Sequence, residues 1–157
     1  MLILVDSGVL LRLMERADPQ HGIIRQAVRA LTARGDELAT GLQNIAEFWN
    51  VCTRPSTSRG GLGLDIDETD RRVRVLERIF TILADQTNTY RLWRRLVVTH
   101  SVQGKQVHDA RLVALMQAHA ITHILTLNGA DFRRYPGITP IDPASFVLPS
   151  PAPPTIP

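Results

Sequence analysis

The sequence predicts an α/β domain of three layers, in which a central parallel sheet lies between two layers of helices. Three observations lead to this prediction. Short apolar runs recur along the chain and end at polar residues or glycine, as buried parallel strands do. Between them lie longer segments whose apolar residues follow helical spacing. One or two helices separate consecutive strands, so the strands should be joined by right-handed crossovers and pair in parallel.

The expected strands are short and apolar. The first, LILV at 2–5, runs directly into Asp6-Ser7-Gly8 and shows no alternation of polar and apolar residues, so both of its faces should be buried. The other strands are expected at 37–40, 80–83, 122–127 and 138–141. The polar segment NGADFRRYPG at 128–137 separates the last two, and we expect it to be a loop.

The expected helices end at recognisable signals. Helical spacing covers 8–17 and 22–35, and Gly35 is typical of a helix C-terminus. A further apolar stripe follows the i, i+3, i+4, i+7 pattern and is closed by Pro55. Its members are Leu42, Ile45, Phe48, Trp49 and Cys52. The remaining helices are expected at 67–79, at 89–100 and from His108-Asp109 to Ala120. The Gly- and Ser-rich segment 56–65 should be a loop, without the Lys-Ser or Lys-Thr of a phosphate-binding loop.

Length and composition indicate a single domain over 1–148, followed by a proline-rich tail, PSPAPPTIP at 149–157, that should be disordered. No apolar run reaches the roughly 20 residues of a membrane helix, and the first residues lack the basic start of a secretory signal. With Cys52 as the only cysteine, an internal disulfide and a thiolate zinc cluster are excluded. We therefore expect a cytoplasmic protein without a membrane segment, in which Cys52 is a small buried side chain.

The charge of the chain mildly favours a polyanionic partner. The formal net charge is +3 and the isoelectric point is about 9.7. Of the 18 basic residues all but Lys105 are arginine, which binds phosphate well.

Acidic residues far apart in sequence are predicted to meet at one edge of the sheet. Asp6 follows the first strand, and Asp131 lies in the expected loop after the fourth. Asp109 lies at the expected start of a helix, and Glu47 lies in the first half of another, one turn after Asn44. Parallel sheets bind ligands at the carboxyl ends of their strands, where the strand order reverses. Carboxylates are suitable ligands for Mg²⁺, which can activate water for attack on a phosphodiester.

Each of these residues also has a purely structural explanation. Asp109 and the pair Asp6-Ser7 suit helix N-caps, Asp131 suits a turn, and Glu47 suits a solvated helix face. Other hydrolase patterns are not found. The five histidines have no metal-binding spacing, there is no GxSxG motif, and Gly8 stands where a haloacid-dehalogenase phosphatase has its second aspartate.

In the order and spacing of its motifs, the chain resembles the PIN-domain family, and specifically the toxin nucleases of bacterial VapBC toxin–antitoxin pairs. The resemblance covers about 2–146 and rests on LVDSGVLL, NIAEFWNV, and VHDARLVALMQAHAITHILTLNGADF followed by GITPIDP. It places the four acidic positions of the family on Asp6, Glu47, Asp109 and Asp131, and the small hydroxyl residue on Ser7. Gly8 departs from the commoner Asp-Thr-Asn or Asp-Ser-Asn opening.

The resemblance implies a ribonuclease in which these four acids bind Mg²⁺ or Mn²⁺ and act in catalysis. Ser7, Asn44 and Asn128 are expected to support the ligands, and Asn128 is an alternative to Asp131 at the fourth position. The implied partners are RNA, a cognate antitoxin protein and a second copy of the chain in a homodimer. The alternative is a PIN-like RNA-binding or scaffold protein without turnover. Retention of all four acids argues against it, because clustered like charges destabilise a site that holds no metal.

Overall fold

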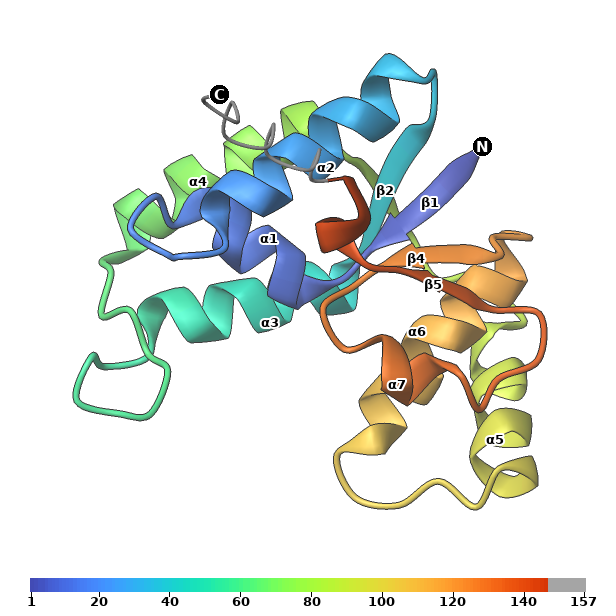
Figure 1. Ribbon diagram of the computed structural model, residues 1–157. Coiled ribbons are helices and arrows are strands. Elements are labelled where there is room, and N and C mark those ends of the chain that lie inside the picture. Colours follow the sequence, from blue (N-terminus) through green and yellow to red (C-terminus); the bar gives the residue numbers. More distant parts are fainter. Residues whose placement is uncertain (147–157) are drawn as a thin grey trace, which may run out of the picture.

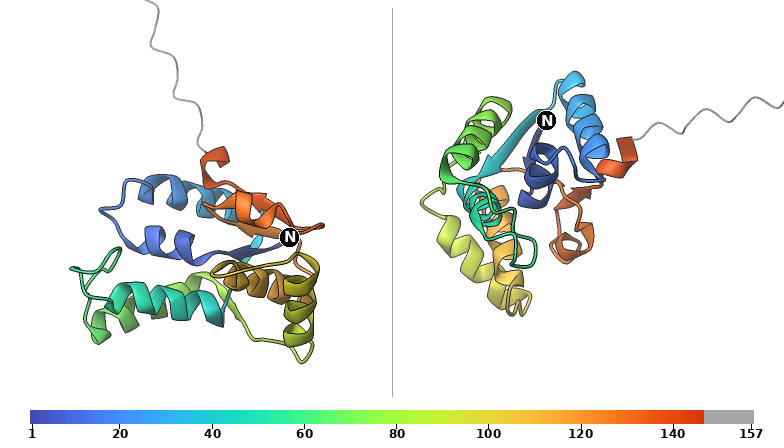
Figure 2. Two further views of the ribbon diagram at one scale, coloured as in Figure 1. Left: turned by 90° about the horizontal axis from the view of Figure 1, so that it is seen from below. Right: turned by 90° about the vertical axis from the view of Figure 1, so that its left-hand side faces the viewer.

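The computed structural model describes residues 1–146, and it confirms the predicted class: a parallel sheet lies between two layers of helices (Figures 1 and 2). The strands are β1 (Leu2–Val5), β2 (Glu37–Gly41), β3 (Thr81–Leu83), β4 (His123–Leu125) and β5 (Thr139–Ile141). The helices are α1 (Ser7–Met14), α2 (His21–Ala33), α3 (Leu42–Thr53), α4 (Ile66–Ile79), α5 (Thr89–Thr99), α6 (Gln106–Ala118), α7 (Gly129–Phe132) and the short 3₁₀ helix η1 (Pro143–Phe146). The tail expected to be disordered lies outside the described residues.

The strand order β3-β2-β1-β4-β5 places the first strand in the middle of the sheet, and every pair is parallel. From β1 the chain builds outward through β2 to β3, then returns to the other side of β1 with β4 and β5. The order therefore reverses between β1 and β4. Val5 pairs with Leu125 there, and the N–H of Asp6 donates to the carbonyl of Leu125 at 3.1 Å. The chain segments after β1 and β4 thus leave the sheet side by side, at the position where such folds bind ligands.

Side chains of the central strand divide the core into two halves. Ile3 and Val5 pack among residues of α1 to α4, whereas Leu4 packs among residues of α5, α6 and α7. All three are fully buried, as the run without alternation predicts. The two halves are the two helical layers, which lie on opposite faces of the sheet in Figure 2. Cys52 lies in the first half, and burial raises the pKa of its thiol to about 11.

Several helix boundaries differ from the prediction by one to three residues, and two of these differences have a local cause. The helix expected over 8–17 ends at Met14, and the following turn is closed by the Asp18 carboxylate, which accepts from the N–H of Gln20 at 2.8 Å. Pro19 also disfavours helical backbone at the residue before it. Helix α6 begins at Gln106, two residues earlier than predicted, because the turns at 103–105 continue directly into it. None of the helices within 1–146 has the length and apolarity of a membrane span.

The prediction of a loop over 128–137 is partly wrong, because this segment contains helix α7. Phe132 in this helix is only 1% exposed and packs into the core half formed by α5 and α6, together with Tyr135. Burial of two large aromatic side chains stabilises a compact turn of helix in a segment whose composition is otherwise polar. The 3₁₀ helix η1 was not predicted; it packs on α2, where Gln26 donates to the carbonyl of Phe146 at 2.9 Å.

Candidate active site

Asp6 is a buried carboxylate at the point where the strand order reverses. It is 9% exposed, and its Oδ2 accepts a hydrogen bond of 2.8 Å from the hydroxyl of Thr126, which directly follows β4. Burial raises the pKa of Asp6 above its ordinary value, the Thr126 hydroxyl lowers it, and the nearby charge of Glu47 raises it. Asp6 is the N-cap residue of α1, but its side chain makes no capping hydrogen bond. The explanation of Asp6 as a simple cap therefore does not account for its side chain.

Glu47 is held from two sides. The Ser7 hydroxyl donates to its Oε2 at 2.7 Å and lies 3.3 Å from Oδ1 of Asp6, so this hydroxyl lies between the two carboxylates. The other oxygen, Oε1, accepts from the side-chain amide of Gln43 at 2.8 Å. Glu47 is thus a partly buried, oriented carboxylate, in contrast to a freely solvated residue on a helix face.

Asp109 lies in the first turn of α6, whose N-cap is Lys105, so the alternative of Asp109 as a helix N-cap is wrong. The side chain is half-buried, and within 1–146 its carboxylate accepts no hydrogen bond. Its pKa is raised to about 6, first by desolvation and then by the negative charges of Asp131, Asp6 and Glu47. The charges of Asp131, Asp6 and Glu47 therefore lie near Asp109, at the same edge of the sheet.

Asp131 reaches the site from α7. Its N–H donates to the carbonyl of Asn128 at 3.1 Å, and the N–H of Asn128 donates to the Thr126 hydroxyl at 3.1 Å. The chain after β4 is thereby folded back so that Asp131 faces Asp109, whose pKa it raises. Asn128 is exposed and takes part in this turn through its backbone.

Asn44 lies one turn before Glu47, as predicted, but its side chain acts elsewhere. It is fully buried, and its Oδ1 accepts from the N–H of Gly41 at 3.2 Å, so it fixes the junction between β2 and α3. Asn44 therefore supports Glu47 only by fixing the start of the helix that carries it.

Three residues around the site were missed in the sequence. Thr126 follows β4 as Asp6 follows β1, and this equivalent position after a buried strand was an available signal. Gln43 lies one helical turn before Glu47 and also donates to the carbonyl of His108 at 3.2 Å. Arg111 donates to Gln43 at 2.9 Å and to Asp85 at 2.7 Å. The contacts of Arg111 join residues far apart in sequence, and no local pattern indicates them.

The side chains at the site offer carboxylate oxygens, the type of donor that hard divalent cations prefer. Among residues 1–146, no three Asp, Glu, His or Cys side chains lie close enough to be direct ligands of one ion. The carboxylates instead repel one another through space, as the raised pKa of Asp109 shows. Mg²⁺ prefers oxygen donors and keeps several of its waters, so a few carboxylates that are not packed together can hold it. Within the described part of the chain none of the four acids forms a salt bridge, although the charge of His108 lowers the pKa of Asp109, so a cation would neutralise their negative charge.

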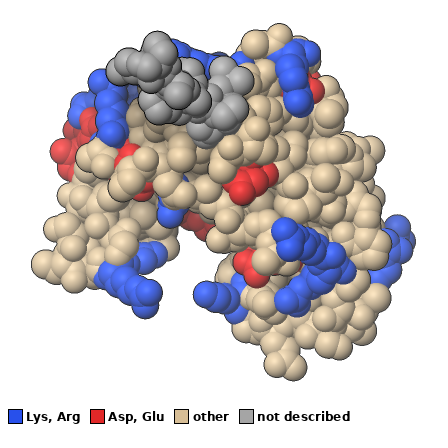
Figure 3. Space-filling view, in the orientation of Figure 1, with Lys and Arg blue, Asp and Glu red and all other residues tan. Residues whose placement is uncertain are grey.

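The surroundings of the site suit a polyanion. Figure 3 shows a notch at the lower side of the molecule, with acidic side chains toward its inner end and Lys and Arg side chains on both sides. A hollow of about 550 Å³ lies beside Glu47 and is lined also by Gln43, His108 and Arg111. Basic flanks attract a phosphate backbone, whereas the acidic centre requires a cation before a phosphate can approach.

The fold and the site together define a class of protein: a doubly wound α/β domain in which acidic side chains from four segments meet at the reversal of strand order. The family model of the PIN domain matches residues 3–138, and the chain belongs to the PIN-domain family. A search of curated protein sequences gave no match.

Solved structures show the same fold at low sequence identity. VapBC2 from Rickettsia felis, bound to a DNA fragment from its promoter, is similar with a TM-score of 0.67 and 12% identity over 90% of this chain and 98% of that chain. A toxin-antitoxin complex from Klebsiella pneumoniae has a TM-score of 0.58 and 21% identity over 87% and 95% of the two chains. Mycobacterium tuberculosis VapC20, described as a sarcin-ricin loop cleaving toxin, has a TM-score of 0.56 and 18% identity over 78% and 86%.

Proposed function

We propose that this chain is a metal-dependent endoribonuclease that acts in the cytoplasm as the toxin of a VapBC-type toxin–antitoxin pair. The observation that carries the proposal is the coupling of Asp109 to Asp6, Glu47 and Asp131, four carboxylates from four segments of the chain. The membership of the PIN-domain family and the similarity to a toxin that cleaves the sarcin-ricin loop support RNA as the substrate class.

The four carboxylates are the residues that would hold Mg²⁺ or Mn²⁺. A bound ion would supply an activated water and would stabilise the leaving oxygen of the phosphodiester. The chain itself orients the ligands: Thr126 fixes Asp6, and Ser7 with Gln43 fixes both oxygens of Glu47. Such hydrogen bonds from neighbouring residues keep carboxylates in position when the charge around them changes.

Cleavage of RNA with and without metal tests this proposal. The purified chain is incubated with RNA in Mg²⁺ or Mn²⁺ and in chelator, beside Asp109→Asn and the matched control Asp67→Asn, an exposed aspartate on α4. Wild type and Asp67→Asn should cleave only with metal, and Asp109→Asn should lose the activity by orders of magnitude. Cleavage that survives both the chelator and Asp109→Asn would contradict the mechanism. A chain that binds RNA but does not cleave it under any condition would be a non-catalytic PIN-like protein.

A groove between α1, α2 and α4 supports an antitoxin as partner. It has a volume of about 760 Å³, and its apolar side chains are Leu13, Met14, Val28, Val75 and Ile79. Two of these, Val75 and Ile79, are 38% and 43% exposed, which is unusual for large apolar residues next to each other on a surface. The basic side chains at the same groove are Arg16, Arg25 and Arg29. This combination suits an apolar segment that also carries acidic residues.

Co-expression with the product of the adjacent gene tests the partner. Ile79→Glu places a charge in the groove and should abolish co-purification. Ile66→Glu, at the exposed first residue of the same helix and outside the groove, should retain it. A wild-type chain that is harmless when expressed alone and co-purifies with nothing would contradict the toxin assignment.

The homodimer stays a prediction. Light scattering of the purified chain should give twice its mass of 17.5 kDa. A single copy in solution would contradict it.

A further inference from the structure

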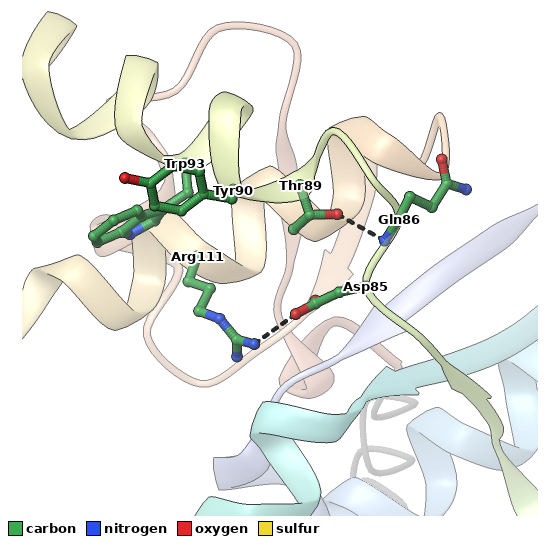
Figure 4. Close-up of a pocket in the computed structure, with 6 residues that line it drawn as sticks. All are labelled: Asp85, Gln86, Thr89, Tyr90, Trp93 and Arg111. Atoms are coloured by element: carbon green, nitrogen blue, oxygen red, sulfur yellow. Dashed lines mark hydrogen bonds and ion pairs between the residues drawn. The ribbon is translucent and has the colours of Figure 1, made fainter.

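Beside the carboxylate site lies a cavity with an aromatic wall (Figure 4). Its volume is about 370 Å³, at the lower end of the roughly 300–1,000 Å³ of small-molecule sites, so it accommodates one nucleoside-sized group. The residues that line it are Asp85, Gln86, Thr89, Tyr90, Trp93 and Arg111. The rings of Tyr90 and Trp93 lie 6.0 Å apart between centroids, at an angle of 39°.

The ring of Trp93 is held by contacts within the domain, whereas the ring of Tyr90 is largely exposed to solvent. The indole N–H of Trp93 donates to the carbonyl of Val107 at 3.0 Å, and the ring packs against the core half around α6. Tyr90 is 70% exposed and is not part of either core half. Packing of the domain therefore accounts for Trp93, but not for the aromatic ring at Tyr90.

A chain of hydrogen bonds connects this cavity to the carboxylates. Asp85 accepts from Arg111 at 2.7 Å, Arg111 donates to Gln43 at 2.9 Å, and Gln43 donates to Glu47 at 2.8 Å. Arg111 lines both this cavity and the hollow beside Glu47. The two hollows thus share a lining residue and are neighbours.

Basic side chains continue along the same helix. Arg91, Arg94 and Arg95 of α5 are exposed and line a further hollow of about 340 Å³. Aromatic rings interleaved with arginines on one helix combine the two features that bind single-stranded nucleic acid: stacking surfaces for bases and positive charge for the backbone.

We propose that the cavity binds an unpaired base of the RNA substrate, which stacks on Tyr90 and Trp93 next to the site of cleavage. The proposal rests on the proposed function and specifies its substrate as single-stranded or looped RNA. Bases inside an A-form duplex cannot stack on Tyr90 and Trp93, whereas unpaired bases stack readily on aromatic side chains. The exposed carboxylate of Asp85, which also accepts from Arg111, offers a hydrogen-bond acceptor to the edge of the base.

The fluorescence of Trp93 tests the stacking directly. In a Trp49→Phe background Trp93 is the only tryptophan, and the measurement in chelator prevents cleavage. A short unstructured RNA should quench the fluorescence, whereas an abasic oligonucleotide of the same length should not. Tyr90→Ala should weaken RNA binding by about 5- to 150-fold, the range that corresponds to stacking of one base. Tyr90→Phe, which keeps the ring, and Ile66→Ala, exposed on α4 and outside both the cavity and the arginine hollow of α5, should bind like the parent.

Three results would overturn the proposal. The first is an unchanged dissociation constant for Tyr90→Ala, and the second is equal quenching by the abasic oligonucleotide. The third is a change of Tyr90→Ala from dimer to monomer in light scattering, which would assign this surface to contact between two copies of the chain. The binding test needs no metal and no turnover, so its outcome is independent of the cleavage assay. A Tyr90→Ala variant that binds and cleaves RNA normally would refute the base site and leave the proposed nuclease intact.

Discussion

Thr126 donates a hydrogen bond of 2.8 Å to Asp6 across 120 residues of sequence, and both side chains are buried. Burial raises the pKa of the Asp6 carboxyl, and this hydrogen bond opposes the rise. The bond also joins the segments after β1 and β4, the two neighbouring strands between which the strand order reverses. One hydroxyl thus holds the first carboxylate of the site in place.

Thr126→Val should destabilise the fold. It removes the donor while leaving a buried carboxylate, and we expect the free energy of unfolding at pH 7 to fall by about 1–3 kcal/mol. Urea unfolding measures this change. Thr126→Ser keeps the hydroxyl and loses one methyl group, so it should stay within about 1 kcal/mol of wild type. Equal losses in both variants would show that packing of the methyl group matters and the hydrogen bond does not.

Ser7→Ala should reduce RNA cleavage about 10- to 100-fold, the usual effect of losing a residue that orients a metal ligand. The Ser7 hydroxyl lies between Glu47 and Asp6, so without it Glu47 keeps only the hydrogen bond from Gln43. Rates under single-turnover conditions, at saturating metal, measure the effect. Ser7→Thr keeps the hydroxyl and is the matched control. Full activity of Ser7→Ala would mean that Glu47 needs no support from this side.

The raised pKa of Asp109 predicts a dependence of apo-protein stability on pH. Its value rises from 3.8 in the unfolded chain to about 6 in the fold, so the folded state binds the proton more tightly. The stabilisation from protonated Asp109 is therefore full below pH 3.8 and is lost as pH rises through about 6. The full shift corresponds to about 3 kcal/mol, and solvent screening of a half-exposed carboxyl reduces our expectation to about 1–2 kcal/mol.

The measurement is the free energy of unfolding of wild type minus that of Asp109→Asn, in chelator, from pH 4 to pH 8. The difference should fall between about pH 4 and pH 6 and then become constant. A difference that does not vary with pH would mean that the pKa of Asp109 is the same in the folded and unfolded chain.

Metal should reverse the order of stability of the same two proteins. In chelator Asp109→Asn should melt at or above the temperature of wild type, because it removes one of four like charges and no helix cap. Mn²⁺ at a hundredfold excess over its dissociation constant should stabilise wild type by about 2.7 kcal/mol. Asp109→Asn should gain much less, and the gain of wild type should shrink below about pH 6, where Asp109 holds a proton. Equal stabilisation of both proteins by Mn²⁺ would exclude Asp109 as a ligand.

Local sequence determined most elements of the fold. The unbroken apolar run at 2–5 predicted a strand buried on both faces, and Ile3, Leu4 and Val5 are fully buried. The helical spacing from Leu42 to Cys52 predicted α3, which ends at Thr53 shortly before Pro55. These predictions succeed because the period of apolar residues and the backbone limits of proline act over a few residues.

The acidic positions could also be named from the sequence, because they follow strands or lie near helix starts, and the resemblance to PIN domains implied their role. Asp109 shows the limit of local signals, because an aspartate near a helix start looks like an N-cap. Only the observed start of α6 at Gln106 places Asp109 inside the helix, where the charges of Asp131, Asp6 and Glu47 raise its pKa. Its environment is set by segments that contact α6 in space.

Tertiary structure alone decided the strand order and the partners of each carboxylate. Thr126 is 120 residues from Asp6, and Arg111 is 68 residues from Gln43, so their hydrogen bonds form only after the sheet has brought the segments together. Helix α7 is a similar case. The polar segment around Asp131 forms this helix because Phe132 is buried in the core next to α6. Such contacts depend on the geometry of the whole domain, because hydrogen bonds and van der Waals contacts act over a few ångströms in space and are indifferent to separation along the chain.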